Sequence, residues 1–546
     1  MSNLMSISYS LNNNWNNALK ASSLVLLQFI ILNLTGIVYL AVAARFLAKF
    51  DMSLLLMASV LINGFTTIFT LAYNYTAAKY IADLLGSNKV YQAKHFGKLI
   101  VYLGLLCSII SLGIGYLVAY LIFLPFNLSY QYILLISIDG AINCLLFFFY
   151  GILLGFFEFK KAVFSFSLAS ASRFLLSVVV ILFYSNVNMV LQIWILGDSL
   201  GLISFLVFSK DIIFKKYNKD KEVFSLVRKS ILFSLPIYIS SLITYLYLYI
   251  DRYLVLYNAG LENYAIYGTA ITASLILMNL PQLISNALLP HFSYILSENK
   301  QLFLETVNST IRVICTALSP FIIAIAMLAE PIMSVFAGIK YTEGWFIFFI
   351  VTLAIGITFP IASLTSALLA LDKSKIIMYS NIVAIAIGTA LTQLFYQNYG
   401  INGAAFGRAS LFILSFLFIS SWFYKRERSA YNASFHIKTA LVSLLLFSPM
   451  LLLNIYRINL SLPLLILFII SSILLYLYLI TKYRLLNEID IKNLSILIPS
   501  PFDKFFYNFF TSLIKPPKIE KTIPNVKYTI PSSYMYIYVY VKPHMQ

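Results

Sequence analysis

The first membrane-length apolar run of the chain covers residues 22–44, SSLVLLQFIILNLTGIVYLAVAA. It holds no charged side chain, and it exceeds the roughly 7–15 apolar residues of a secretory signal peptide. A helix rises about 1.5 Å per residue, so a run of this length crosses the hydrocarbon core of a bilayer, which is about 30 Å thick. The sequence therefore predicts an uncleaved transmembrane helix near the N-terminus.

Similar apolar runs recur along the whole chain and predict about fourteen transmembrane helices. Transmembrane β-strands alternate polar and apolar residues over about 10 positions, whereas these runs are apolar on all sides over twice that length. The predicted fold is therefore an all-α polytopic membrane protein. The expected helix centres are Leu34, Thr66, Ile110, Asn143, Phe174, Leu200, Thr244, Leu277, Ile323, Ala354, Ile387, Ile413, Leu445 and Ile470.

Composition excludes several other classes of protein. Of the 546 residues, 61% are hydrophobic and 11% are charged, whereas soluble domains carry about 25% charged residues. Cys107, Cys144 and Cys315 each lie inside an apolar run, so they form neither a disulfide framework nor a CxxC metal motif. The four histidines are scattered without ligand spacing. The sequence therefore predicts no metal site and no resident cofactor.

The net charge of +18 indicates topology rather than nucleic-acid binding. Loops that follow even-numbered runs hold 21 Lys and Arg residues. Loops and helix ends that follow odd-numbered runs hold five, namely Arg45, Lys49, Arg252, Lys340 and Arg457. Because basic loops stay in the cytoplasm, both termini are expected to be cytoplasmic and no nucleic-acid partner is expected.

An internal repeat divides the chain. Four short motifs recur in order at offsets of 207–214 residues, beginning with Ala44–Leu47 and Asp251–Leu254. This offset spans six helices, so the two copies enter the membrane in the same direction and form two parallel lobes. The predicted parts are a cytoplasmic segment (1–21), an N-lobe (22–212), a basic loop (213–230), a C-lobe (231–424), two further helices (435–481) and a cytoplasmic tail (482–546) with an interfacial helix at Pro501–Lys515.

The chain resembles the polysaccharide exporters of the multidrug/oligosaccharidyl-lipid/polysaccharide (MOP) flippase superfamily. The resemblance covers roughly residues 20–480, but Ala48–Asp51 stands where those exporters usually have a glycine-proline turn. The matching stretches are AVAARFLAKFD at Ala41–Asp51, Ser234–Ile237, Tyr249–Leu254, Tyr264–Gly268, Leu289–Pro290, Phe336–Tyr341 and Tyr399–Ala405.

This resemblance implies a flippase in the plasma membrane of a bacterium or archaeon. Such a protein turns lipid-linked oligosaccharides, carried on polyprenyl phosphate or pyrophosphate, across the membrane by alternating access, without enzymatic chemistry. It is expected to act as a monomer, with membrane lipids and glycan polymerases or transferases as partners. A cation-coupled multidrug exporter is the alternative within this fold. A membrane-embedded glycosyltransferase or polymerase is a weaker one, because every predicted outside loop is short.

Four arginines are the predicted substrate-binding residues, because a guanidinium stays charged and grips phosphate with two parallel hydrogen bonds. Arg173 and Arg408 lie inside apolar runs, while Arg45 and Arg252 end the first and seventh runs. Packing explanations remain open for all four. Arg173 could instead form a salt bridge with an acidic neighbour, and Arg45 and Arg252 could extend toward the membrane surface.

Four acidic residues are predicted to pair with these cations or to carry a coupling H⁺ or Na⁺: Asp139, Asp198, Asp251 and Glu330. Asp139 and Asp198 are the expected partners of Arg173 in a salt bridge. Asp198 and Arg408 also fall at related levels of the repeat. A bond between these two that opens and closes with the transport cycle is a further hypothesis.

Overall fold

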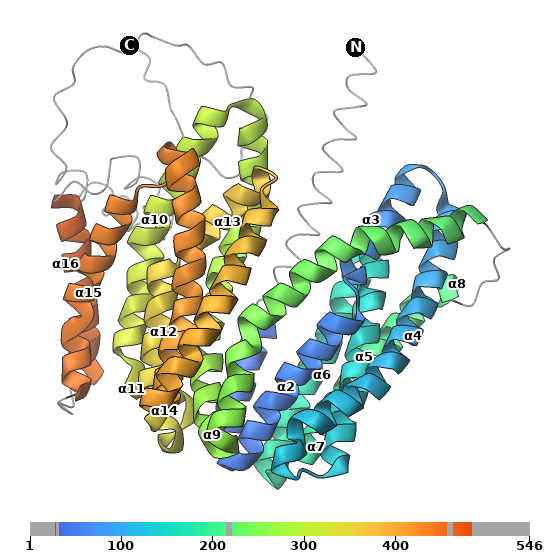
Figure 1. Ribbon diagram of the computed structural model, residues 1–546, viewed down its shortest axis with the longest axis horizontal. Helices are drawn as coiled ribbons and strands as arrows, with labels where there is room; N and C mark the ends of the chain where they lie inside the picture. Colours follow the sequence, from blue (N-terminus) through green and yellow to red (C-terminus); the bar gives the residue numbers. More distant parts are fainter. Residues whose placement is uncertain (1–27, 29–31, 214–220, 456–461, 483–546) are drawn as a thin grey trace. The chain divides into compact units, whose positions relative to one another are not determined.

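The computed structural model describes residues 28, 32–213, 221–455 and 462–482, and every regular element in these ranges is a helix (Figure 1). The all-α prediction is therefore confirmed. A helix at Leu32–Phe46 precedes the labelled elements. These are α2 (Lys49–Phe69), α3 (Tyr73–Gly86), α4 (Val90–Phe123), η1 (Leu124–Phe126), α5 (Tyr130–Gly155), α6 (Phe159–Tyr184), α7 (Val187–Phe208), α8 (Lys210–Ile213), α9 (Lys221–Glu298), α10 (Lys300–Met327), α11 (Ala329–Ala337), η2 (Ile339–Gly344), α12 (Trp345–Thr358), α13 (Ile361–Ala370), α14 (Ser374–Arg426), η3 (Arg428–Ala430), α15 (Ala433–Ile455) and α16 (Leu462–Lys482).

Many of these helices are long enough to cross a membrane. Within the described residues, ten helical segments are long and apolar enough to cross a membrane, and three shorter apolar helices accompany them. Each of the fourteen predicted helix centres falls inside a helical segment. The chain is therefore a multi-pass membrane protein, while the exact number of crossings and the side of the termini stay predictions. The predicted tail helix at Pro501–Lys515 lies outside the described residues.

Polar caps start several of the helices. The side chain of Ser129 accepts a hydrogen bond from the Tyr132 amide at the start of α5, and Asn186 and Asn299 do the same for the first amides of α7 and α10. A capping side chain satisfies amides that have no partner within the helix. These short polar loops therefore fix where the apolar runs become helical.

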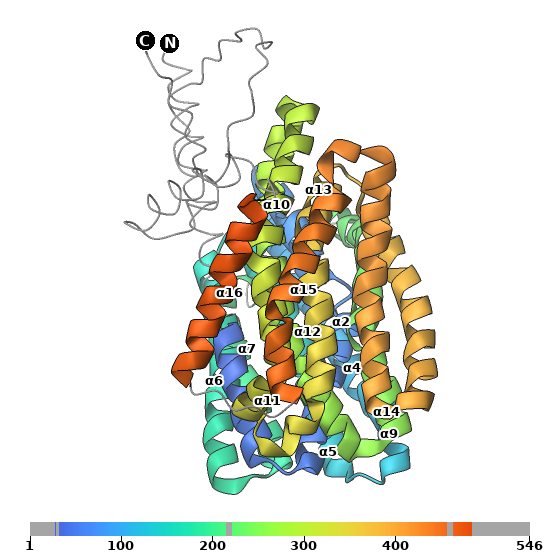
Figure 2. The same cartoon turned by 90° about the vertical axis from the view of Figure 1, so that its left-hand side faces the viewer.

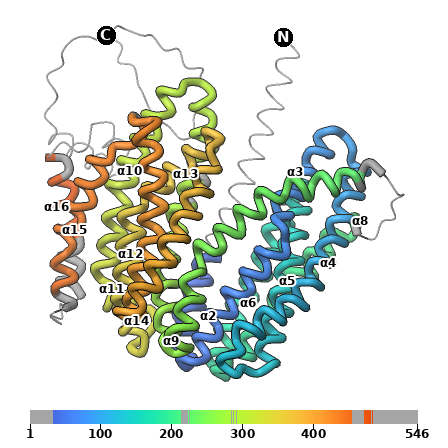
Figure 3. Tube along the Cα trace, viewed as in Figure 1, coloured from blue at the N-terminus to red at the C-terminus, as the bar shows by residue number. Residues whose placement is uncertain are grey.

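The long elements α9 and α14 are each two helices joined at a glycine. Gly260 has φ 75° and Gly400 has φ 58°, a backbone region that favours glycine. Tyr267 donates a 2.6 Å hydrogen bond to Asp251, although sixteen residues of straight helix would separate them by about 24 Å. The chain therefore reverses within α9, and Figure 3 traces this reversal and the one in α14.

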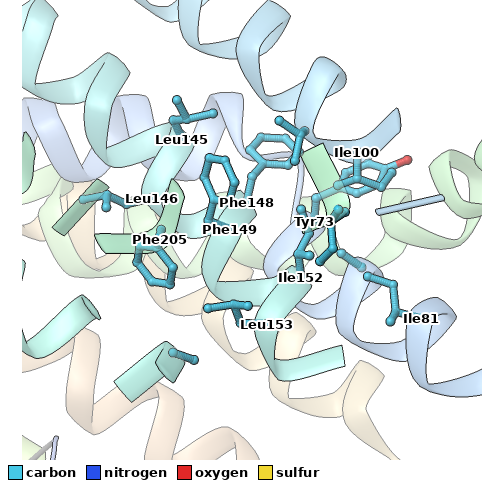
Figure 4. Close-up of a cluster of buried hydrophobic side chains, with 14 of the residues drawn as sticks. Tyr73, Ile81, Ile100, Leu145, Leu146, Phe148, Phe149, Ile152, Leu153 and Phe205 are labelled. Carbon is cyan, nitrogen blue, oxygen red and sulfur yellow. The ribbon is translucent and has the colours of Figure 1, made fainter. Parts of the chain in front are cut away.

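The described residues of the first half of the chain build most of one compact unit. This unit holds the described residues up to Leu280 together with Ala329–Ala354 and Ser374–Phe416. Within it α6 packs along α7 and α4 along α5. Figure 4 shows Phe148, Phe149, Ile152 and Leu153 of α5 in the buried cluster that also contains Tyr73 of α3 and Phe205 of α7.

The second unit holds Pro281–Leu328, Ile355–Lys373 and the described residues from Leu417 onward. In it α10 and α15 lie side by side, as Figure 2 also shows. Tyr476 of α16 donates a hydrogen bond to the Cys315 carbonyl of α10 at 3.3 Å, and His436 of α15 contacts the Ile357 carbonyl at 2.7 Å. Buried polar contacts therefore join the helices of this unit.

One boundary differs from the sequence prediction. The range 213–230 was expected to be a loop, yet α9 is already helical from Lys221. Lys and Glu are good helix formers, so a charged stretch can extend a helix beyond the apolar part that spans the membrane. The first compact unit also mixes helices of both predicted lobes, and the lobe boundaries themselves stay a prediction.

Candidate functional site

A cavity of about 350 Å³ lies inside the first compact unit. Its walls come from the helix Leu32–Phe46 and from α2, α5, α6, α7 and α9, and most of them are apolar. The two charged residues that line it are Arg173 and Arg252. Its polar lining residues are Asn33, Ser59, Asn63, Thr66, Asn143 and Thr272. An apolar cavity with a few convergent polar and charged groups has the build of a ligand-binding site.

Arg173 of α6 forms ion pairs with two buried carboxylates. Its Nη1 lies 2.8 Å from Asp198 of α7, and its Nη2 lies 3.2 Å from Asp139 of α5. Asn143 donates a 2.5 Å hydrogen bond to the same Asp198 oxygen. The structure therefore brings three predicted site residues together, and the predicted salt bridge of Arg173 is present to both acids at once.

An aromatic ring also holds the Arg173 guanidinium in place. Its central carbon lies 3.9 Å from the centre of the Trp194 ring, within the range of a cation–π interaction. Tyr39 lies beside this ring, with centroids 6.2 Å apart, and all three residues line the cavity. The guanidinium is thus fixed on three sides while 12% of its side chain stays exposed.

Small residues let α6 and α7 approach closely enough for these contacts. A Cβ atom on Gly197 would lie 2.5 Å from the Arg173 amide nitrogen, and one on Gly201 would lie 2.4 Å from the Ala169 Cβ. Ser165 and Ser204 share a 2.8 Å hydrogen bond across the same interface. The small-residue stretch 165–172 therefore serves close helix packing, as its composition favours.

Gly197→Ala is expected to destabilise the protein by about 1–3 kcal/mol, the usual effect of overpacking. The added methyl group would push the Arg173 backbone away from α7 and shift the guanidinium relative to Asp198. Thermal unfolding of the detergent-purified variant measures the effect. Gly113→Ala is the matched control, because its Cβ meets no atom within 4 Å. Equal unfolding temperatures for the two variants would contradict the close-packing account.

Arg252 of α9 reaches the same cavity from another direction. Its side chain is 4% exposed, and its Nη2 donates a 3.1 Å hydrogen bond to Thr272. Its central guanidinium carbon lies 5.2 Å from the centre of the Tyr249 ring. Among the described residues no carboxylate lies within ion-pair distance of Arg252, although the sequence allowed pairing with an acidic neighbour. A buried cation without an opposite charge is costly, which makes it a candidate ligand for an anion.

Arg408 lies away from this cavity and is completely buried in α14. Its Nη1 donates hydrogen bonds to the Tyr247 and Leu248 carbonyls and contacts Asp251 at 3.1 Å. Tyr267 donates to the other Asp251 oxygen. The pair therefore joins α14 to both arms of α9. The structure shows no Asp198–Arg408 bond of the kind hypothesised to switch with the transport cycle. Asp198 pairs with Arg173, and Arg408 pairs with Asp251.

Arg45 sits at the end of the helix Leu32–Phe46, exposed to solvent. It donates a hydrogen bond to the Val335 carbonyl of α11, and Lys340 donates to the Arg45 carbonyl at 3.1 Å and to the Leu47 carbonyl. Arg45 and Arg252 are therefore not equivalent in the structure, since only Arg252 lines the cavity. The sequence repeat alone could not show this difference.

Glu330 is half-buried in the first turn of α11. No ion pair joins it to another described residue, and it does not line the cavity. The three cysteines are buried and are not bonded to one another. No group of three His, Cys, Asp or Glu residues in the described part of the chain could hold a metal ion.

Sequence reasoning missed several residues that shape the cavity. The sequence predicts Asn143 only as the centre of an apolar run, and Thr272 falls within the polar stretch 269–274, which the sequence assigns to helix packing in preference to cavity lining; Trp194 and Tyr39 are not predicted at all. Asn143 follows Asp139 by one helical turn, so a polar residue on the same face of an apolar helix was a signal for it. Trp194 and Tyr39 depend on contacts between helices and leave no pattern within a single run.

Comparison with solved structures shows the fold. The lipid II flippase MurJ, in an inward closed conformation, matches with a TM-score of 0.64 and 14% identity, over 84% of this chain and 98% of that one. An inward-facing multidrug resistance MATE family transporter of the MOP superfamily matches with a TM-score of 0.55 and 13% identity, over 73% and 96%. A Vibrio cholerae MATE transporter matches with a TM-score of 0.50 and 15% identity, over 76% and 99%.

The sequence comparison identifies the family. No curated protein matches the chain significantly. Residues 18–296, just over half of the chain, match the family described as polysaccharide biosynthesis protein. The resemblance to polysaccharide exporters is thereby confirmed, and so is a fold shared with transporters of the MOP superfamily. The chain belongs to the polysaccharide biosynthesis protein family.

Proposed function

We propose that this protein is a flippase that moves a lipid-linked oligosaccharide, carried on polyprenyl phosphate or pyrophosphate, across the plasma membrane of a bacterium or archaeon. Its membership of the polysaccharide biosynthesis family and its fold support a transporter that delivers glycan for surface polysaccharide or glycoprotein. The observation that carries the proposal is one cavity lined by Arg173 and Arg252, the second of which has no carboxylate partner among the described residues.

The chemistry of the substrate explains why such a cavity is needed. A phosphate group must cross about 30 Å of hydrocarbon, where an isolated charge is strongly unfavourable. Arg252 would bind the phosphate directly, because its charge is not balanced by an acid. Arg173, held by Asp139, Asp198 and Trp194, would supply a second positive contact with little loss of side-chain freedom. The lipid tail would stay in the bilayer.

The acids beside Arg173 give a route to ion coupling. Asp139 and Asp198 together would carry two negative charges against one on Arg173. Neither Asp139 oxygen accepts a hydrogen bond from a described residue, although Arg173 lies within ion-pair distance. A H⁺ or Na⁺ bound at this pair would cancel the excess negative charge and favour entry of the phosphate. We therefore propose these acids as the coupling site.

The cavity must widen during transport. Its volume of about 350 Å³ corresponds to about twelve water molecules at about 30 Å³ each, which leaves room for a phosphate or pyrophosphate but not for a whole oligosaccharide. Alternating access would supply the additional space for the sugars. Transport of this kind breaks no covalent bond, so the substrate should leave the protein chemically unchanged.

Reconstitution tests the proposal. Purified protein in liposomes should move a fluorescent lipid-linked oligosaccharide between leaflets faster than protein-free liposomes do, and the recovered substrate should keep its mass. A lipophilic cationic drug serves as the comparison substrate. Drug export without any movement of lipid-linked sugar would favour a cation-coupled multidrug exporter. A lengthened glycan would instead indicate a glycosyltransferase or polymerase.

A further inference from the structure

A second pocket, separate from the arginine cavity, opens within the first compact unit. It has a volume of about 700 Å³ and is lined by residues of η2, α12 and both arms of α14. Five of its seven lining residues are aromatic, and the other two are an amide and a carboxylate. The lining residues are Glu343, Trp345, Phe346, Phe395, Tyr399, Asn402 and Phe406.

The break in α14 builds this pocket. Gly400 has a positive φ of 58°, and a Cβ atom on Gly403 would lie 1.9 Å from the Phe395 carbonyl oxygen. Only glycine permits the two arms to approach so closely at this point. As a result Tyr399 and Asn402 lie on either side of the turn, and both are exposed residues that line the pocket.

The aromatic residues form a connected surface. Phe406 lies 5.8 Å from Phe346 and 5.9 Å from Phe395 between ring centres, and Trp345 lies 5.7 Å from Phe346. These distances are typical of stabilising aromatic pairs, so the four rings hold one another in place in the lining of the pocket. Tyr399 also lines the pocket and is 66% exposed.

Polar groups complete the chemistry. The side chain of Glu343 is 71% exposed, and the Lys49 ammonium lies 3.8 Å from its carboxylate. The Asn402 side chain, which also lines the pocket, forms no hydrogen bond with any described residue. An aromatic ring suits the apolar C–H face of a pyranose sugar, while a carboxylate and an amide accept and donate hydrogen bonds to its hydroxyl groups. A purely lipid-facing aromatic belt needs neither polar group.

We infer that this pocket binds the sugar portion of the transported glycan, as neutral pyranose units of the glucose or N-acetylglucosamine type. The charge pattern of the loops predicts that the breaks in α14 and after α11 face the outside, so the pocket would hold sugars on the exit side. The inference rests on the proposed function, because it takes the glycan as cargo. It adds a second contact site for the sugars, apart from the site for the phosphate.

Binding of free sugars tests the pocket without transport. Maltotriose and chitotriose are titrated into the protein in lipid nanodiscs and followed by saturation-transfer NMR. Tyr399→Ala is expected to raise the Kd of a bound trisaccharide about 2- to 12-fold, the loss of one aromatic contact. Tyr184→Ala is the matched control. Tyr184 is also 66% exposed and lies near the predicted outside, but it does not line the pocket.

Three results would overturn the inference. The first is that neither trisaccharide binds saturably. The second is that Tyr399→Ala and Tyr184→Ala weaken binding equally. The third is that brominated lipid quenches the fluorescence of Trp345 and that neither trisaccharide reduces this quenching. The Trp345 signal is identified by its loss in Trp345→Phe. Such a result would assign the pocket to lipid acyl chains. If translocation is intact but no trisaccharide binds, only the sugar-binding role of this pocket is rejected. If translocation is absent, the proposed flippase function is rejected regardless of trisaccharide binding.

Discussion

Arg252→Ala is expected to lower the initial rate of lipid-linked oligosaccharide translocation by about 10- to 100-fold, the equivalent of losing one charge-assisted hydrogen bond of about 1.5–3 kcal/mol. The physical reason is that Arg252 is a buried cation whose side-chain partner in the structure is the Thr272 hydroxyl rather than a carboxylate. Without it, the substrate phosphate would enter an apolar cavity opposite an arginine already occupied by two acids. The assay is the rate in proteoliposomes at matched protein insertion.

Two variants give this prediction its controls. Arg252→Lys keeps the charge but loses the planar pair of donors, so it should fall between the wild type and Arg252→Ala. Arg312→Ala removes a half-buried arginine of α10 that packs on Phe435 and does not line the cavity. It should translocate at close to the wild-type rate. Full activity in Arg252→Ala would show that this arginine serves packing and not phosphate binding.

Asp251→Asn is expected to destabilise the protein by about 3–5 kcal/mol, because it leaves the buried Arg408 charge without its carboxylate. Arginine cannot shed its proton in a protein, so the charge cannot be relieved by neutralisation. An asparagine at this position can still accept a hydrogen bond from Tyr267, which confines the change to the ion pair. Denaturant-induced unfolding in detergent measures the loss.

The double variant Asp251→Asn with Arg408→Met should recover most of that stability. Replacing a whole buried ion pair by uncharged groups is often neutral, whereas removing one partner is not. Glu158→Gln is the control for charge removal as such, because the Lys161–Glu158 pair is 41% and 45% exposed and is worth no more than about 1 kcal/mol. Wild-type stability in Asp251→Asn would contradict the structural role of the pair.

Much of the fold was predictable because each transmembrane helix appears in the sequence as one apolar run. The apolar runs centred at Thr244 and Leu277 predict two helices, and the structure joins them at Gly260 within α9. The charged stretch from Lys221 predicts a loop but is helical in the structure, because charge marks the end of a membrane crossing and not the end of a helix. The sequence therefore predicts the presence of a helix more reliably than it predicts where the helix begins and ends.

The candidate site was predictable only in part. Buried charges in apolar runs pointed to Arg173, Asp139 and Asp198, and the structure pairs them. Their pairing depends on Gly197, which sets how closely α6 and α7 approach, and no single run contains that information. In the same way Arg45 and Arg252 look equivalent in the repeat. They differ because the chain reverses after Arg252 and brings Thr272 beside it. Arg45, near the end of its helix, instead donates a hydrogen bond to the Val335 carbonyl of α11.

The central claim, that the cavity binds phosphate through Arg173 and Arg252, is tested most directly by comparing two lipids that share one polyprenyl chain and differ in whether it ends in a pyrophosphate or a hydroxyl group. Undecaprenyl pyrophosphate and undecaprenol are titrated against the wild type and the Arg173→Ala/Arg252→Ala double variant. The account predicts that the wild type binds the pyrophosphate about 10- to 100-fold more tightly than the alcohol, and that the variant binds both alike. The same preference for pyrophosphate in the double variant, or no preference in the wild type, would contradict it.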